Sequence, residues 1–353
     1  MPTPLPIFDG HNDLLLRLYR KDPSDAARVL LEGDGSGHLD LPRMRRGGFV
    51  GGLFAIFVPD PEDDPHADDQ MVKPSYDLPL PAPLGQAYAL GATLHMAAIL
   101  LQAERRSGGA IRLCRTGADL DAARSEGAVA AVLHIEGAEA IGPDLHALDV
   151  LHAAGLRSLG PVWSRPNIFG HGVPFRFPST GDIGGGLTER GRALVRRCNE
   201  LRIVVDLSHL TERGFWDVAR LSDAPLVATH SNAHAVCPHS RNLTDRQLDA
   251  IAESGGMVGV NFATSFIRPD GRKDAKTPLE DLLRHVDHLI DRLGIAGVGL
   301  GSDFDGATVP QAIGDVAGLP RLVDAMRRHG YDEETLRKLL HDNWISLLKR
   351  SWG

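Results

Sequence analysis

Short apolar runs rich in β-branched residues alternate along this chain with longer segments of helical period. The runs lie near residues 6–11, 47–58, 128–136, 157–163, 202–209, 225–231, 256–262 and 297–303. Eight strands separated by helical spacers are typical of a (β/α)8 barrel. We therefore predict an α/β protein with a (β/α)8 TIM barrel, formed by a single domain over residues 1–353, with an open doubly wound sheet as the weaker alternative.

Three spacers carry the clearest helical signals. Residues 187–200 are a helical candidate with Thr188 as a plausible N-cap, and residues 279–293 have an apolar stripe at helical spacing. Residues 333–348 predict a terminal helix.

Histidines and acidic residues stand where the apolar runs end. In a TIM barrel the C-terminal ends of the strands converge on one face, which holds the active site. Imidazole and carboxylate groups gathered there suit Zn²⁺ or a similar divalent ion. A ligand set drawn from so many strands also favours a closed barrel. The residues at these ends are His11 and Asp13 (first run), Glu136 (third), His209 (fifth), His230 (sixth) and Asp303 (eighth).

The spacing adds detail to this predicted site. His11 and Asp13 are two residues apart on an extended strand end, so both can face one metal while Asn12 points away. Glu136 follows a run that should be buried, and a buried carboxylate needs a charge partner such as a metal. At the last strand Asp305 competes with Asp303, which we prefer because it is closer to the strand end.

Other polar residues are open to two interpretations. Arg241 offers a bidentate fork that suits a carboxylate, although a surface arginine is an equal alternative. His134 lies two residues before Glu136, so both side chains should face the same side of the strand. It is either part of the barrel core or a residue that supports the metal ligands. His234 and His239 follow His230 in an irregular segment and could line the pocket.

Residues 59–83 form a long acidic and proline-rich segment after the second run. A loop in this place should emerge on the catalytic face, and loops this long are usually functional or disordered. We expect a lid or a subunit-contact loop, with a solvated insertion as the alternative.

Composition narrows the class of protein. The chain has 353 residues, 42% of them hydrophobic and 24% charged, which is ordinary for a globular protein. Its net charge of −8 argues mildly against nucleic acid as a partner. No apolar stretch is long enough for a membrane span and no secretory leader is visible, so we expect a cytoplasmic protein. Its three cysteines form no CxxC pair, so no disulfide framework is expected.

Several short segments also carry a family resemblance. They are residues 9–13 (Asp-Gly-His-Asn-Asp), 134–137 (His-Ile-Glu-Gly), 206–209 (Asp-Leu-Ser-His), 229–231 (Thr-His-Ser), 236–237 (Val-Cys), 241–242 (Arg-Asn) and 301–306 (Gly-Ser-Asp-Phe-Asp-Gly). In this order, along a barrel pattern, the chain resembles the membrane (renal) dipeptidase family, the M19 metallopeptidases of the amidohydrolase superfamily, over nearly its whole length.

The resemblance implies a zinc-dependent dipeptidase that is commonly a homodimer. Two Zn²⁺ ions per subunit would be bridged by Glu136 and a hydroxide, with His11 and Asp13 on one ion and His209 and His230 on the other. Asp303 would handle the proton and Arg241 would bind the terminal carboxylate of a dipeptide, often one with a D-residue at its C-terminal position.

Trp163 departs from the family pattern. It stands where the family usually has a histidine that holds the substrate, and an indole donates one N–H but cannot act as an imidazole. We expect Trp163 to contact substrate, with Arg165, Asn167 or His171 as possible substitutes for the missing group. Because of this departure, the alternative function is that of another amidohydrolase, acting on N-acyl amino acids, lactams or cyclic amides. A non-catalytic metal- or ligand-binding barrel is the alternative of a different class.

Overall fold

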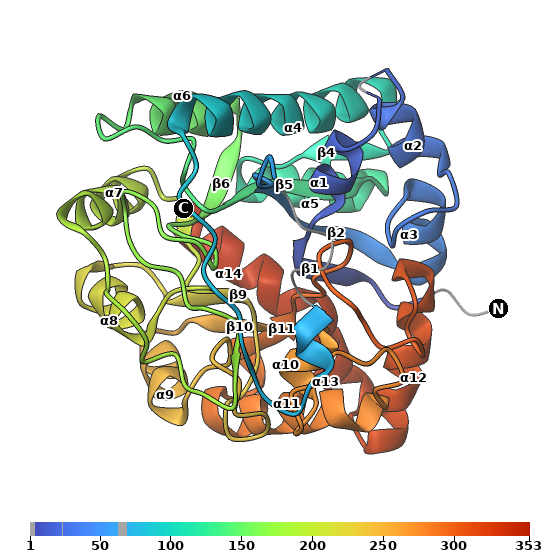
Figure 1. The fold of residues 1–353 in the computed structure, drawn as a ribbon. Helices are drawn as coiled ribbons and strands as arrows, with labels where there is room; N and C mark the ends of the chain where they lie inside the picture. Colours follow the sequence, from blue (N-terminus) through green and yellow to red (C-terminus); the bar gives the residue numbers. More distant parts are fainter. Residues whose placement is uncertain (1–3, 23, 63–68) are drawn as a thin grey trace.

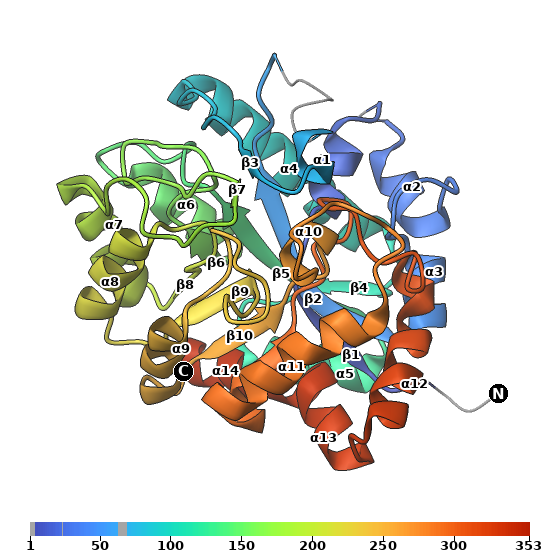
Figure 2. The same cartoon turned by 60° about the horizontal axis from the view of Figure 1, so that its bottom comes forward.

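In the computed structural model, which describes residues 4–22, 24–62 and 69–353, eight parallel strands form one curled sheet (Figures 1 and 2). Each of these eight strands pairs with the strand that precedes or follows it among the eight in the sequence. A parallel bridge between Asp206 and Val227 brings the two ends of the sheet together. The (β/α)8 prediction is confirmed. The strands are β1 (Ile7–Asn12), β2 (Phe49–Phe57), β5 (Val129–Glu136), β6 (Leu156–Gly160), β8 (Val204–Val205), β9 (Val227–Ser231), β10 (Met257–Val260) and β11 (Val298–Leu300).

Helices surround the sheet, as Figure 2 shows. They are α1 (Leu14–Tyr19), α2 (Ala26–Glu32), α3 (Leu41–Gly47), α4 (Gln86–Arg106), α5 (Gly117–Glu126), α6 (His146–Ala154), α7 (Glu189–Glu200), α8 (Glu212–Leu221), α9 (Asp245–Glu253), α10 (Thr264–Ile267), α11 (Leu279–Leu293), α12 (Leu319–His329), α13 (Glu333–Arg337) and α14 (Asn343–Trp352). Within the described residues, none of these helices has the length and apolar character needed to cross a bilayer.

The helical signals in the sequence agree with these bounds. Helix α7 begins after Thr188, whose hydroxyl accepts a hydrogen bond from the Gly191 amide at 3.1 Å, as an N-cap should. Helix α11 spans the residues of the predicted stripe. The predicted terminal helix is two α-helices, α13 and α14, joined by a π-helical turn at Lys338–Asp342.

Three short strands were not foreseen. Strand β4 (Ile111–Leu113) pairs with the first half of β5, so β6 pairs only with its second half. Strands β3 (Tyr76–Asp77) and β7 (Arg176–Phe177) form a separate antiparallel pair. Strand β3 belongs to the predicted loop 59–83, of which residues 63–68 lie outside the described part of the chain.

Trp344 fills part of the barrel core from α14. Its indole is fully buried and donates a hydrogen bond to the Leu300 carbonyl at 2.8 Å. A Cβ on Gly10 would lie 2.4 Å from the indole, and one on Gly299 would lie 2.5 Å from it, so only glycine leaves room for this side chain. The polar side chains of the predicted site lie at the C-terminal ends of the strands.

Candidate metal centre

The five predicted metal ligands come together at the C-terminal ends of the strands. His11 lies in β1 with Asp13 directly after it, Glu136 ends β5, His230 lies in β9, and His209 follows β8. Glu136 Oε1 lies 3.1 Å from His209 Nε2, 3.2 Å from His230 Nε2 and 3.7 Å from His11 Nε2. His11 Nε2 is in turn 3.4 Å from Asp13 Oδ2. Glu136 therefore stands between two pairs of side chains.

The polar atoms of this cluster fit a divalent cation. His209 Nε2 and His230 Nε2 face each other at 3.0 Å. Among the described residues, His11 Nε2 and Glu136 Oε1 have no hydrogen-bond partner although both are buried. Leaving such atoms unsatisfied is costly, and nitrogen and carboxylate oxygen are ligands that zinc accepts. Among the described residues, three groups of side chains each have ligand atoms within 4.8 Å of one another. They are His11, Glu136 and His230; His11, Asp13 and Asp303; and His11, His134 and Asp206.

Burial sets the charge state of the ligands. It lowers the pKa of His209 and of His230 well below the usual value, so both imidazoles are neutral and keep a lone pair. It raises the pKa of Glu136 well above the usual value. Burial also acts to lower the pKa of His11, but the charges of Glu136 and Asp13 outweigh it and raise that pKa to about 10. A proton on His11 balances the carboxylates, and a divalent cation bound among them would supply that balance instead.

Two site residues have left-handed backbone angles that only the fold reveals. His209 has φ 67° and Asp303 has φ 58°. Such angles are uncommon for residues with a side chain, and the strain they imply is concentrated at functional sites. His209 is further held by Ser164, whose hydroxyl lies 2.8 Å from its Nδ1.

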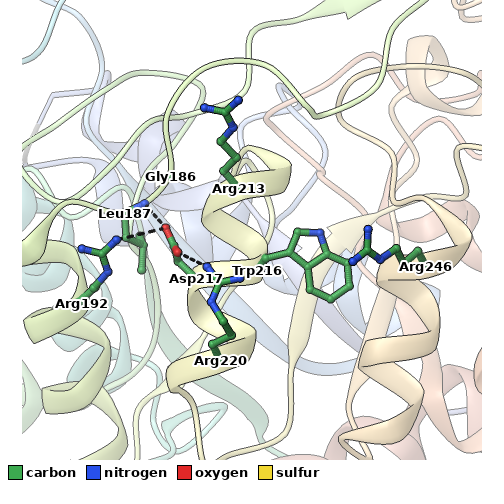
Figure 3. Close-up of a pocket in the computed structure, with 8 residues that line it drawn as sticks. All are labelled: Gly186, Leu187, Arg192, Arg213, Trp216, Asp217, Arg220 and Arg246. Carbon is green, nitrogen blue, oxygen red and sulfur yellow. Dashed lines mark hydrogen bonds and ion pairs between the residues drawn. The ribbon is translucent and has the colours of Figure 1, made fainter.

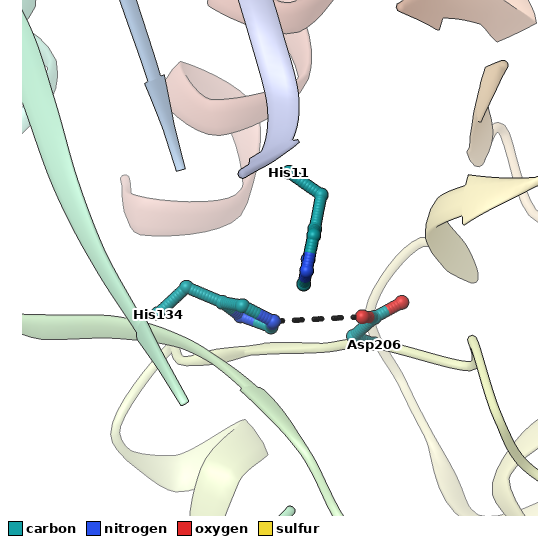
Figure 4. Close-up of side chains that lie close together, drawn as sticks. All are labelled: His11, His134 and Asp206. Carbon is teal, nitrogen blue, oxygen red and sulfur yellow. Dashed lines mark ion pairs between the residues drawn. The ribbon is translucent and has the colours of Figure 1, made fainter. Parts of the chain in front are cut away.

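His134 and Asp206 lie beside His11 without belonging to the five predicted ligands (Figure 4). His134 Nε2 is 3.6 Å from Asp206 Oδ2, and His134 Nδ1 is 2.9 Å from the Ser158 hydroxyl. All of these side chains are buried. This placement fits the expectation that His134 supports the ligands from the barrel interior.

Asp303 and Asp305 have different surroundings. Asp303 groups with His11 and Asp13, and its Oδ2 accepts a hydrogen bond from the Asn261 amide at 2.9 Å. Burial and the charge of Asp13 raise its pKa to about 6. Asp305 instead pairs with Arg17, whose Nε is 3.0 Å away. Asp303 is therefore the better placed of the two for proton transfer.

A cavity of about 580 Å³ opens over the cluster. Five of the predicted site residues line it, Asp13, Glu136, Trp163, His209 and Asp303. The described part of the segment 59–83 also contributes lining residues, Gln70, Met71, Leu78, Pro79, Leu80 and Pro81.

Trp163 forms an aromatic wall of this cavity. Its ring centroid lies 4.8 Å from that of Phe57 and 5.7 Å from that of His209. Arg165 is buried behind it, with its guanidinium carbon 5.6 Å from the Trp163 ring and its Nε 3.2 Å from Glu139. Asn167 donates to the Pro161 carbonyl at 2.9 Å. Because their polar groups are engaged away from the cavity, Arg165 and Asn167 are not placed to substitute for the family histidine.

Arg241 is buried next to the ligands. Its Nη2 donates to the His230 carbonyl at 3.1 Å, and its guanidinium lies 5.5 Å from the centroid of the Phe266 ring, which does line the cavity. Its Nε has no hydrogen-bond partner among the described residues. Burial lowers the pKa of Arg241 to about 10, so the side chain stays cationic at neutral pH.

A second cavity, of about 410 Å³, lies on the outer side of the molecule between α7, α8 and α9 (Figure 3). Arginines dominate its lining, and its carboxylate, Asp217, is already engaged by the Leu187 amide at 2.9 Å and by Arg220. Arg246 stacks over Trp216 at 4.7 Å. These groups offer no ligand set of the kind found at the strand ends.

Two residues that hydrogen-bond to site side chains were not predicted from the sequence. Asn261, which holds Asp303, follows β10, and Ser164, which holds His209, follows β6. Their position just after a strand is a usable signal. Single amides and hydroxyls are common there, however, so the signal alone does not distinguish them.

Comparison with known proteins agrees with this geometry. The family model for membrane dipeptidase (Peptidase family M19) matches residues 2–351. A metallopeptidase from Rhodobacter sphaeroides, crystallised with a phosphinate mimic of the dipeptide L-Ala-D-Ala, is 60% identical, with a TM-score of 0.97 over 99% of this chain and 100% of that chain. The structure of dipeptidase AC, a family M19 metallopeptidase, is 61% identical, with a TM-score of 0.97 over 100% of both chains. An uncharacterised Klebsiella pneumoniae protein from the pqqA 5′ region is 51% identical over 255 residues, which cover 72% of this chain and 94% of that protein.

Proposed function

Since the chain belongs to the membrane dipeptidase family, peptidase family M19, and is a metal-dependent dipeptidase, we propose that it uses two Zn²⁺ ions to cleave dipeptides of the L-Xaa-D-Xaa type. The observation that carries the metal proposal is the convergence of three imidazole Nε2 atoms on Glu136 Oε1. The phosphinate mimic of L-Ala-D-Ala bound by the Rhodobacter sphaeroides relative supports the substrate class. The dipeptidase prediction itself is confirmed, and the non-catalytic barrel is no longer supported.

In this proposal His11 and Asp13 would hold one ion, His209 and His230 would hold the other, and Glu136 would be shared between them. Two divalent ions bound here would lower the pKa of water toward neutrality and polarise a scissile carbonyl. The aspartate at position 303 accepts the proton of the attacking water and passes it to the leaving amine. Its contact with Asn261 and its place beside His11 and Asp13 support this role.

The cavity wall then selects the substrate. Trp163 and Phe57 present aromatic faces, and residues 70–71 and 78–81 of the single 1–353 domain also line the pocket. A cavity of about 580 Å³ suits a dipeptide better than a long peptide. A homodimer and a cytoplasmic location stay predictions.

The substrate proposal is tested with zinc-loaded protein and a dipeptide panel in L-L and L-D series, with the released amino acid measured. We expect faster turnover of the L-D members. Turnover confined to L-L dipeptides contradicts the proposed stereochemistry. Failure of every dipeptide directs the search to N-acyl amino acids, lactams and cyclic amides, with Trp163 as the suspected cause.

Replacing Arg241 by alanine should raise KM mainly for substrates with a free C-terminal carboxylate. The reason is that a guanidinium binds a carboxylate through charge-assisted hydrogen bonds worth about 1.5–3 kcal/mol, or roughly 10- to 150-fold. The measurement compares KM for one dipeptide and for its C-terminal amide. An equal rise for both substrates removes Arg241 from carboxylate binding.

A further inference from the structure

Asp206 is a buried carboxylate that accepts three hydrogen bonds close to His230, and its Oδ2 also lies 3.6 Å from His134 Nε2. Its Oδ1 accepts from the Ser208 amide at 3.0 Å and from the Thr229 amide at 2.8 Å, and its Oδ2 accepts from the Thr229 hydroxyl at 2.6 Å. The side chain is 1% exposed. Both carboxylate oxygens therefore act as hydrogen-bond acceptors.

The Thr229 hydroxyl connects this carboxylate to a predicted metal ligand. Thr229 Oγ1 also lies 2.8 Å from His230 Nδ1. A hydroxyl has a single hydrogen, and Thr229 donates it to Asp206 Oδ2. The remaining contact is satisfied when His230 Nδ1–H donates to the Thr229 oxygen.

The direction of these hydrogen bonds determines the tautomer of His230. A neutral imidazole with its hydrogen on Nδ1 has its lone pair on Nε2. Nε2 is the atom that lies 3.2 Å from Glu136 Oε1 and 3.0 Å from His209 Nε2. The lone pair of His230 is therefore presented to the centre of the cluster.

We propose that Asp206, acting through the Thr229 hydroxyl, is a positioning residue that holds His230 in its metal-binding tautomer and orientation. This inference rests on the proposed function, because it takes His230 as a zinc ligand. A carboxylate behind a ligating histidine fixes its ring and raises its basicity, and losing such a partner typically costs about 10- to 100-fold in metal affinity.

The arrangement differs at the other histidine of the pair. Ser164 Oγ lies 2.8 Å from His209 Nδ1. In the described part of the chain, however, no carboxylate accepts a hydrogen bond from Ser164 as Asp206 does from Thr229. We call the connection from Asp206 through the Thr229 hydroxyl to His230 the carboxylate relay. Among the described residues it has no counterpart at His209.

The test is zinc affinity and stoichiometry of the full-length protein, measured by competition with a chromophoric chelator. Thr229→Val has nearly the same shape but no hydroxyl, and we expect it to bind one of the two zinc ions about 10- to 100-fold more weakly. Thr229→Ser restores the hydroxyl and should return the affinity close to that of the parent. Thr93→Val is the matched control, because Thr93 is equally buried on α4 and its hydroxyl has no partner among the described residues.

The outcomes separate this inference from the proposed function. Parental affinity for both zinc ions in a folded Thr229→Val protein overturns the relay. A parent protein that does not bind two zinc ions overturns the proposed function instead. If Thr229→Val does not fold, Asp206→Asn carries the test, since it keeps the shape and removes the charge. A change in the visible spectrum of the cobalt-substituted variant is expected, and a lower Tm with unchanged metal affinity and spectrum assigns the residues a merely structural role.

Discussion

Replacing Asp303 by asparagine is expected to lower kcat by about 10²- to 10⁴-fold, the range contributed by general acid–base catalysis. The amide keeps the shape of the carboxyl group and can still accept the hydrogen bond from Asn261, but it cannot take up the proton of an attacking water. Because the five predicted metal ligands remain, zinc content should stay at the parental level. The measurement is kcat together with metal analysis of the same preparation.

Asp305→Asn is the matched control for this variant. It makes the same chemical change two residues along the chain, at a carboxylate that is bound to Arg17. We expect a much smaller loss of kcat, accompanied by some loss of stability. Near-parental turnover of Asp303→Asn, or a larger loss in Asp305→Asn, would show that the proton is handled elsewhere.

Removal of the metal by a chelator should abolish dipeptide hydrolysis and lower the Tm. The buried imidazoles and carboxylates lose the cation that satisfies them, and His11 must then take up a proton to balance Glu136 and Asp13. A ligand present at about a thousand times its Kd stabilises the folded state by roughly 4 kcal/mol, so the loss should be visible in thermal unfolding.

Re-addition of Zn²⁺ should restore both the activity and the Tm, and the stoichiometry at full recovery tests whether two ions are bound. Turnover that survives complete removal of the metal would contradict the proposed mechanism.

The local pattern of the sequence determined the strands, the main helices and the place of the site. The hydrophobic periodicity of strands and helices is visible in short stretches of consecutive residues. Helix α11 and the strands ending near Glu136 and His230 could therefore be predicted from neighbouring positions alone. Parallel strand ends converge in any barrel. Polar residues at those ends therefore predicted a common site without knowledge of side-chain packing.

Only the tertiary structure decided how that site is built. The pairing of Asp305 with Arg17, the burial of Arg165 behind Trp163 and the relay from Asp206 to His230 join residues whose contacts depend on packing between distant segments. The left-handed backbone at Asp303 likewise needs its surroundings to hold it. These features follow from three-dimensional complementarity between segments, which the periodicity of a single sequence does not encode.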